Sequence, residues 1–136
     1  MKIINSIATT LVVALLLTSC ARKLTFAPST VVPAAGGNVK YKKDNNNNYS
    51  ITVNVVNLAE AKNLNPPRNL YVVWLDGDRG AAKNIGQINT SSSLLSKTLK
   101  GELKATSTSK PNRVFITAED DNTVQYPGAQ VVLSTQ

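Results

Sequence analysis

Few residues of this chain have side chains that could do chemistry. The 136-residue sequence contains one cysteine, Cys20, and no histidine. Histidine is the commonest general base and a common ligand of zinc and copper, so its absence removes many acid–base and metal mechanisms. Neither a Gly-x-Ser-x-Gly elbow nor a Walker-type phosphate loop occurs. We therefore predict a protein that is not an enzyme and that needs no cofactor.

The residues before Cys20 determine the chemistry that we predict for it. A short basic lead containing Lys2 is followed by an apolar run, Ile7 to Leu17, and then by Thr18 and Ser19. This order is typical of a secretory signal peptide. The run ends before it reaches the ~20 apolar residues that a membrane-spanning helix needs. We therefore predict a leader that directs secretion and is then removed.

Leu17-Thr18-Ser19-Cys20 resembles the lipobox of bacterial lipoproteins, in which a leucine and small residues precede the modified cysteine. The resemblance implies that residues 1–19 form a lipoprotein signal peptide, and that the Cys20 thiol carries a thioether-linked diacylglycerol. Two or three acyl chains, at about 0.8 kcal/mol for each buried methylene, attach a protein durably to a membrane. The alternative is an ordinary secreted protein in which the cysteine stands at this position by accident.

The residues after Cys20 bear on location. In some Gram-negative bacteria, lipoproteins sent to the cell surface carry acidic residues after the lipidated cysteine, whereas Ala21, Arg22 and Lys23 follow in this chain. We therefore expect a lipid-anchored envelope protein on the periplasmic face of the outer membrane rather than on the cell surface. Residues 20–26 are expected to form the lipidated cysteine and its tether, and residues 27–136 the β-sandwich domain.

The chain that remains after cleavage has the size of one domain and a positive charge. It has 117 residues (136 − 19), and 14 basic residues (15 − 1, without Lys2) against 8 acidic ones give a balance of +6 (14 − 8). A solvated surface without a specific role is the first interpretation of such a charge. The predicted compartment argues against nucleic acid, so the specific use that the charge would favour is attraction to anionic lipid headgroups or acidic glycans.

Alternation of apolar and polar residues predicts strands early in the domain. Tyr49 to Val55 is the clearest, because every second residue is apolar or aromatic and the residues between are polar. Residues 38–43 alternate too, and their lysines are typical of a strand at a sheet edge. Asp44 and the asparagines up to Asn48 are predicted to form the hairpin turn between these two strands.

Apolar segments separated by turn signals continue to the C-terminus. Leu70 to Leu75 is apolar on both faces, so we predict a central strand that is covered on both sides. Shorter strands are expected at Lys83–Ile88, Val114–Ala118 and Gln130–Leu133, with loops at Asp76–Gly80, Ser91–Ser93 and Glu119–Asn122. Two segments remain ambiguous: Leu58–Leu64 fits a helical turn or a strand, and Leu94–Leu103 fits a helix face or a bulged strand.

Several short strands with turns between them predict an all-β fold, namely an immunoglobulin-like antiparallel β-sandwich after the N-terminal signal peptide. The disulfide that joins the sheets of antibody domains is impossible with one cysteine. We therefore expect Trp74 and Phe115 to pack between the two sheets and hold them together. Trp74 is interpreted as a core residue rather than a platform for a ligand, because its neighbours on both sides are apolar.

Two acidic segments invite comparison with calcium sites. Asp76 and Asp78 begin an EF-hand-like pattern, but Gly80 and Gln87 stand where that loop needs an oxygen ligand and a glutamate. A tight turn is predicted there instead. The segment Glu119, Asp120 and Asp121 could hold a weak calcium ion, and the alternative is a charged hairpin loop. We assign no metal site.

From Leu70 onward, the order of features resembles the extracytoplasmic domain of anti-sigma-K factors. The matching segments are Tyr71-Val72-Val73-Trp74-Leu75, Ile85-Gly86, Ile116-Thr117-Ala118-Glu119, Tyr126-Pro127-Gly128 and Val131-Val132-Leu133. The resemblance covers half of the chain and implies a β-sandwich sensor or interaction module outside the cytoplasm, without catalytic residues. Those factors hold their sigma factor with a cytoplasmic domain that this sequence lacks, so no sigma factor is expected as a direct partner.

Together these features predict a membrane-anchored envelope lipoprotein that acts as a non-catalytic binding or interaction module. Its expected partners are the membrane, through lipid on Cys20, and an envelope protein or glycan. The alternatives are a structural envelope lipoprotein without a specific ligand and, as the weakest, a hydrolase. The sequence assigns no binding residue.

Overall fold

Strands make up nearly all of the regular structure. A computed structural model of the protein describes residues 20–92 and 99–136. The strands are β1 (Arg22–Thr25), β2 (Gly36–Lys43), β3 (Tyr49–Leu58), β4 (Leu70–Asp76), β5 (Lys83–Gln87), β6 (Asn89–Ser92), β7 (Leu99–Ser107), β8 (Arg113–Glu119) and β9 (Val131–Ser134), and a short 3-10 helix, η1 (Ala61–Asn63), follows β3. The prediction of an all-β fold is confirmed for this part of the chain. The predicted signal peptide, residues 1–19, lies outside it.

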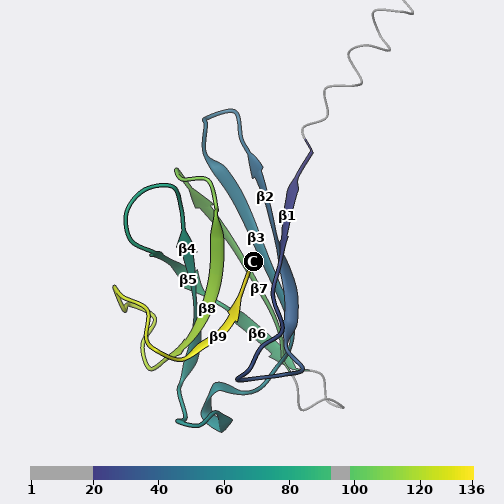
Figure 1. Cartoon of the computed structure of the whole chain (residues 1–136), viewed down its shortest axis with the longest axis vertical. Helices are drawn as coiled ribbons and strands as arrows, with labels where there is room; N and C mark the ends of the chain where they lie inside the picture. Colours follow the sequence, from purple (N-terminus) through teal and green to yellow (C-terminus); the bar gives the residue numbers. More distant parts are fainter. Residues whose placement is uncertain (1–19, 93–98) are drawn as a thin grey trace, which may run out of the picture.

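The strands form two antiparallel sheets that face each other like the layers of a sandwich (Figure 1). The five-stranded sheet has the order β1-β2-β3-β7-β6, and the four-stranded sheet has the order β5-β4-β8-β9. The chain changes sheet between β3 and β4, between β5 and β6 and between β7 and β8. At the second of these crossings lies Ile88, which is buried between β5 and β6.

Apolar side chains from both sheets meet in one core. Ile51 and Val53 of β3 point inward from the five-stranded sheet, and Val73 of β4 and Leu133 of β9 point inward from the other. The alternation predicted for Tyr49–Val55 is therefore confirmed. Full burial of an aliphatic side chain stabilises a fold by about 1.5–3 kcal/mol, so this core is the main source of stability.

Trp74 and Phe115 lie on the opposite face of the four-stranded sheet, in a second and smaller cluster. Their rings stack with centroids 6.3 Å apart and an angle of 15° between planes. Val72 completes the buried cluster, and Val124 from the loop before β9 packs against it. The prediction that β4 is covered on both faces is confirmed. The prediction that Trp74 and Phe115 hold the two sheets together is wrong, because side-chain alternation along β4 turns Trp74 away from the other sheet.

The start of the domain also differs from the prediction. The sequence places residues 38–43 at a sheet edge, but β2 lies between β1 and β3, because Arg22–Thr25 pair with Asn38–Tyr41. Phe26 is buried and forms a bridge to Thr135. The tether expected at residues 20–26 is therefore too long, since β1 already begins at Arg22. As an inner strand, β2 forms backbone hydrogen bonds along both of its edges. The spacing of its lysines alone does not indicate this position.

The remaining segments settle the other expectations. The loop expected at Ser91–Ser93 is wrong for its first two residues, which pair with β7 as part of β6. The ambiguous segment is a strand from Leu99 to Leu103, and both of these leucines pack against the main core. Its earlier residues, Leu94 and Leu95, lie outside the described residues. Leu58–Leu64 contains the helical turn η1, and the short strands expected in the C-terminal half are present as β5, β8 and β9.

Candidate functional site

Cys20, the one residue to which the sequence assigns chemistry, is exposed at the start of the described chain. Only Ala21 separates it from β1. Cys20 belongs to neither of the two hydrophobic clusters, so a group attached to its thiol would displace no core side chain.

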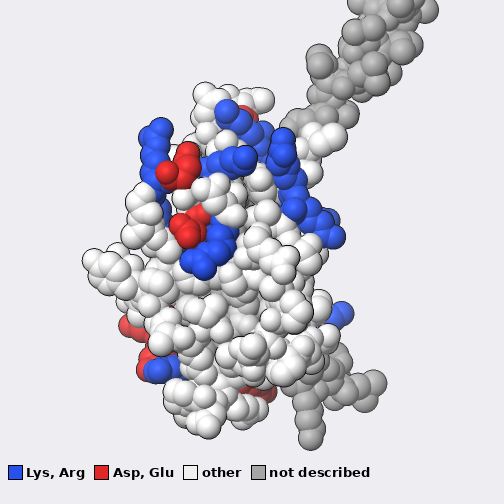
Figure 2. All heavy atoms as spheres, viewed as in Figure 1, with Lys and Arg blue, Asp and Glu red and all other residues white. Residues whose placement is uncertain are grey.

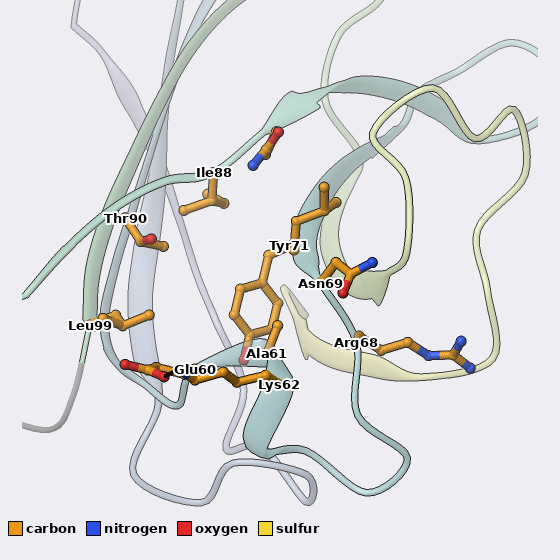
Figure 3. A pocket seen from close by; sticks show the side chains of 11 residues that line it. Glu60, Ala61, Lys62, Arg68, Asn69, Tyr71, Ile88, Thr90 and Leu99 are labelled. Atoms are coloured by element: carbon orange, nitrogen blue, oxygen red, sulfur yellow. Dashed lines mark ion pairs between the residues drawn. The ribbon is translucent and has the colours of Figure 1, made fainter.

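A groove of about 420 Å³ lies at the end of the two sheets where η1 is located (Figure 3). Its walls come from η1 and the loop after it, from the start of β4, from the crossing between β5 and β6 and from the start of β7. The lining residues are Glu60, Ala61, Lys62, Arg68, Asn69, Leu70, Tyr71, Gln87, Ile88, Thr90 and Leu99. The sequence points to none of them, because they come from separate segments that become neighbours only in the folded chain.

Backbone hydrogen bonds hold two of these walls in place. The Arg68 N–H donates to the Ala61 carbonyl over 2.9 Å, which folds the proline-containing loop back onto η1. The Ile88 N–H donates to the Tyr71 carbonyl over 3.0 Å, which fixes the crossing between the sheets against β4. The shape of the groove is therefore set by the backbone as well as by side chains.

Tyr71 forms the floor of the groove. Its side chain is 2% exposed, and its hydroxyl donates a hydrogen bond to the Ala59 carbonyl over 2.7 Å. Burial raises the pKa of Tyr71 to about 12, because the phenolate would lose its hydration. At neutral pH the ring is uncharged and its hydroxyl already has an acceptor, so Tyr71 shapes the groove and does not transfer protons.

Charged side chains stand in pairs at the rim. Lys62 Nζ lies 2.9 Å from Glu60 Oε2, and Arg68 Nη1 lies 2.9 Å from Asp120 Oδ2. The hydrogen bond to Glu60 and the charge of that carboxylate raise the pKa of Lys62. Exposed ion pairs contribute little to stability. Each of these side chains could therefore leave its ion-pair partner and bind a ligand instead, at a small cost in free energy.

The groove combines an apolar floor with hydrogen-bonding groups around it. Tyr71, Ile88 and Leu99 supply apolar surface, and the exposed side chains of Asn69 and Thr90 supply donors and acceptors. Such a mixture is typical of ligand sites. The described lining residues include neither serine nor cysteine. This lining is suited to noncovalent binding.

The three acidic residues considered for calcium have separate partners. Glu119 is buried, Asp120 pairs with Arg68, and the Asp121 carboxylate accepts hydrogen bonds from the backbone N–H and the hydroxyl of Thr123, at 2.7 and 2.9 Å. These two bonds lower the pKa of Asp121. Within residues 20–92 and 99–136, no three His, Cys, Asp or Glu side chains are placed to share a metal ion. Glu119 is the last residue of β8, so the loop expected at Glu119–Asn122 begins only at Asp120, and Asp121 is held within it by local hydrogen bonds.

A buried hydrogen-bond chain links Trp74 to Glu119, and the sequence gives little sign of it. Trp74 Nε1 donates to Thr117 Oγ1 over 2.8 Å, and the Thr117 hydroxyl donates to Glu119 Oε1 over 2.6 Å. The Gly128 N–H donates to the same carboxylate oxygen over 2.7 Å. The one available signal is the i, i+2 spacing of Thr117 and Glu119, which places both on one face of β8. The chain anchors the loop before β9 and supplies no reactive group to the groove.

One further spacing bears on the hydrolase alternative. Ser107 to Lys110 is a Ser-x-x-Lys pattern, which in some hydrolases carries the nucleophile. Residues three apart share a face on a helix but not on a strand. In this protein Ser107 ends β7, and its hydroxyl oxygen accepts a hydrogen bond from the Ser109 N–H over 3.0 Å. The pattern serves a turn.

Comparisons with protein families, curated proteins and solved structures found no match for this chain. In the part that the structure describes, no helix is both long and apolar enough to cross a membrane.

Proposed function

We propose that the protein is an envelope lipoprotein, attached to a membrane by lipid on Cys20, that presents a non-catalytic binding module. The observation that carries this proposal is the position of Cys20, which is exposed and lies two residues before β1. Acyl chains at this position would leave both hydrophobic clusters intact. The lipobox-like residues 17–19 and the apolar run before them supply the signal for the modification.

We further propose that the module has an immunoglobulin-like fold. In such domains the first, second, fifth and fourth strands form one sheet, and the third, sixth and seventh form the other. The orders β2-β3-β7-β6 and β5-β4-β8-β9 correspond to this arrangement, with β5 as an additional strand of the second sheet and β1 as an additional strand of the first. The strand order thus supports a fold that serves many proteins for recognition rather than for one particular reaction.

The groove is the proposed binding site, and it lies far from the anchor. Arg22 pairs with Tyr41, Tyr41 with Ile51, and Ile51 with Ala105, so β1 begins near the end of β7. Leu99, at the start of β7, lines the groove. A strand of nine residues spans about 27 Å. A chain anchored at Cys20 would therefore carry the groove at the other end of the sheets (Figure 1).

The likeness to anti-sigma-K factors is retained as part of the proposal, for the fold alone. Its segments fall on β4, β5, β8 and β9 and on the loop that contains Gly128. Binding of an envelope protein or glycan is proposed from the groove and does not depend on that likeness. A purely structural lipoprotein remains the alternative, and it predicts that no partner occupies the groove.

The test of the anchor is Cys20→Ser, with cells fed a clickable fatty acid and then fractionated. A hydroxyl is a far weaker nucleophile than a thiolate, so the variant should lose both the label and the membrane association. Ala21→Ser is the matched control, because it adds a hydroxyl at the next residue and leaves the thiol. A Cys20→Ser protein that still incorporates label and sediments with membranes would refute the lipoprotein proposal.

The test of the groove is photo-crosslinking in whole cells, with a photoreactive amino acid at Asn69 or at Thr90. Both side chains are exposed at the groove. The control position is Thr108, which is exposed beyond the end of β7, away from the groove. A discrete adduct from the groove positions and none from Thr108 is expected. Absence of adducts from all three would favour the structural alternative.

Protease treatment of intact cells tests location, because a periplasmic module should survive it.

A further inference from the structure

Lysine and arginine side chains gather at the end of the five-stranded sheet where β1 begins (Figure 2). Six of them come from three strands and form what is called the basic patch: Arg22, Lys23, Lys40, Lys42, Lys43 and Lys104. All six are exposed.

The strand register places three of these lysines in one row. Lys23 pairs with Lys40, Lys40 pairs with Thr52, and Thr52 pairs with Lys104. Paired residues of antiparallel strands share a face, and Val39 beside Lys40 is buried, so the row lies on the outer face of the sheet. Like charges directly opposite each other destabilise a sheet. The row therefore needs an explanation other than stability.

Acidic groups near the basic patch do not balance it. Glu102 Oε1 lies 3.6 Å from Lys104 Nζ in an exposed pair. The Asp44 carboxylate accepts hydrogen bonds from the backbone N–H groups of Asn46 and Asn48 in the hairpin turn. Even if both acids are counted, the patch keeps a charge of +4 (6 − 2).

The distance to the proposed anchor is short. Cys20 precedes Arg22 by two residues, and an extended chain covers at most about 3.6 Å for each residue, or about 7 Å in total. The Debye length at physiological ionic strength is about 8 Å. Lipid on Cys20 would thus hold the start of the basic patch within the range where the charge of a membrane surface acts.

We propose that the basic patch lies against the anionic headgroups of the membrane in which Cys20 is anchored, so that the groove points away from that membrane. This inference rests on the proposed lipid attachment. The charge of the other end supports it, because Glu60 and Asp120 are paired with Lys62 and Arg68 at the rim of the groove, so these four side chains add no net positive charge that the same surface would attract. Arg22 pairs with the buried Tyr41, and Lys43 lies on the same side of β2 as Tyr41, so the six charges surround this end of the sheet rather than cover one face. Charges placed around the end fit an end-on approach to a layer of headgroups.

The experiment uses the full lipidated protein, purified from membranes and placed in vesicles of phosphatidylcholine, alone or mixed with an equal part of phosphatidylglycerol. Lysines are acetylated for a short time, and the rate at each one is read by mass spectrometry. The acetylation rates of Lys40, Lys42 and Lys104 should be at least about fivefold lower on the anionic vesicles. A lysine near an anionic membrane surface gains about 1 kcal/mol, which corresponds to about that factor in an equilibrium constant. Lys62, on η1, should react equally on both and serves as the internal control. The protection should disappear in 1 M salt, where the Debye length falls to about 3 Å.

A double variant provides the second arm. Lys40→Gln with Lys42→Gln should remove most of the protection of Lys104, whereas Lys62→Gln should leave it unchanged. Equal rates on both vesicles, or equal protection of Lys62, would overturn the inference. Protection by a soluble acidic polysaccharide but not by vesicles would also overturn it and would favour a glycan as the partner. The mass of the same protein reports its acylation: a protein without acyl chains on Cys20 would refute the lipoprotein proposal and this inference with it, whereas an acylated protein with equal rates would refute this inference alone.

Discussion

Thr117→Val should cost far more stability than its small change in shape suggests. Valine has nearly the shape of threonine but cannot accept the hydrogen bond from Trp74 Nε1 or donate the one to Glu119 Oε1. Trp74 is 0% exposed, so its N–H would lose its partner without access to water, at about 1–3 kcal/mol. The lost bond to the carboxylate adds about 1.5–3 kcal/mol, although the Gly128 N–H continues to donate to that carboxylate. The expected total is about 2.5–6 kcal/mol, a large part of the 5–15 kcal/mol typical of a folded protein.

Thr117→Ser is the matched control for this prediction. It retains the hydroxyl with both hydrogen bonds and removes one methyl group, at about 1 kcal/mol. Urea denaturation of the chain from Ala21 onward can be followed by fluorescence of Trp74, since it is the only tryptophan. If the free energies of unfolding of the valine and serine variants lie within about 1 kcal/mol of each other, the hydrogen-bond chain does not have the importance assigned to it.

Three other predictions follow from local geometry. In Gly101→Ala the new Cβ would overlap Ile88 Cγ2, so the variant should lose about 1–3 kcal/mol in thermal unfolding, whereas Gly36→Ala, with open space at its Cβ, should lose less. Stability should fall as the pH rises from 10 towards about 12, because the unfolded chain releases the proton of Tyr71 in that range while the folded chain retains it; melting temperatures of Tyr71→Phe should fall less steeply. Asp44→Ala removes the acceptor of two backbone N–H groups in the hairpin turn and should cost about 1–2 kcal/mol in urea denaturation, and Asp44→Asn, which keeps an acceptor oxygen, should cost less.

Several parts of the fold could be predicted because they depend on neighbours in sequence. The alternation of Tyr49–Val55 reports which side chains face the core, and the asparagine-rich turn after Asp44 forms within a few residues. The strand order depends on distant segments. The lysines of β2 are spaced as at an edge, but only the pairing with Arg22–Thr25 decides that β2 is an inner strand. Ser91 and Ser92 likewise become part of β6 through pairing with β7. Neither is apolar, so the sequence gives no alternation that would predict a strand there.

The candidate site was even less accessible to the sequence. Its one chemical signal, the cysteine after a short apolar run, is local and could be read directly. The groove, by contrast, is formed by Glu60, Tyr71 and Leu99, which lie on separate elements and have ordinary structural roles when viewed one at a time. The row of lysines on the outer face is evident only from the register of the strands β1, β2, β3 and β7.

The second hydrophobic cluster shows the same limit in its clearest form. Along β4, Tyr71 and Val73 contribute to the core between the sheets, whereas Val72 and Trp74 contribute to the outer cluster. Both sets are equally apolar, so the sequence correctly indicates that each face of β4 is covered. It does not indicate which segment covers each face. One cover is a sheet, and the other includes the loop that contains Val124, which lies 50 residues beyond Trp74 (124 − 74). That loop is tied down by Glu119 through the Gly128 N–H, and Glu119 is held in turn by Thr117. A buried carboxylate therefore secures the loop over the tryptophan, which explains why a polar chain runs beside an apolar cluster.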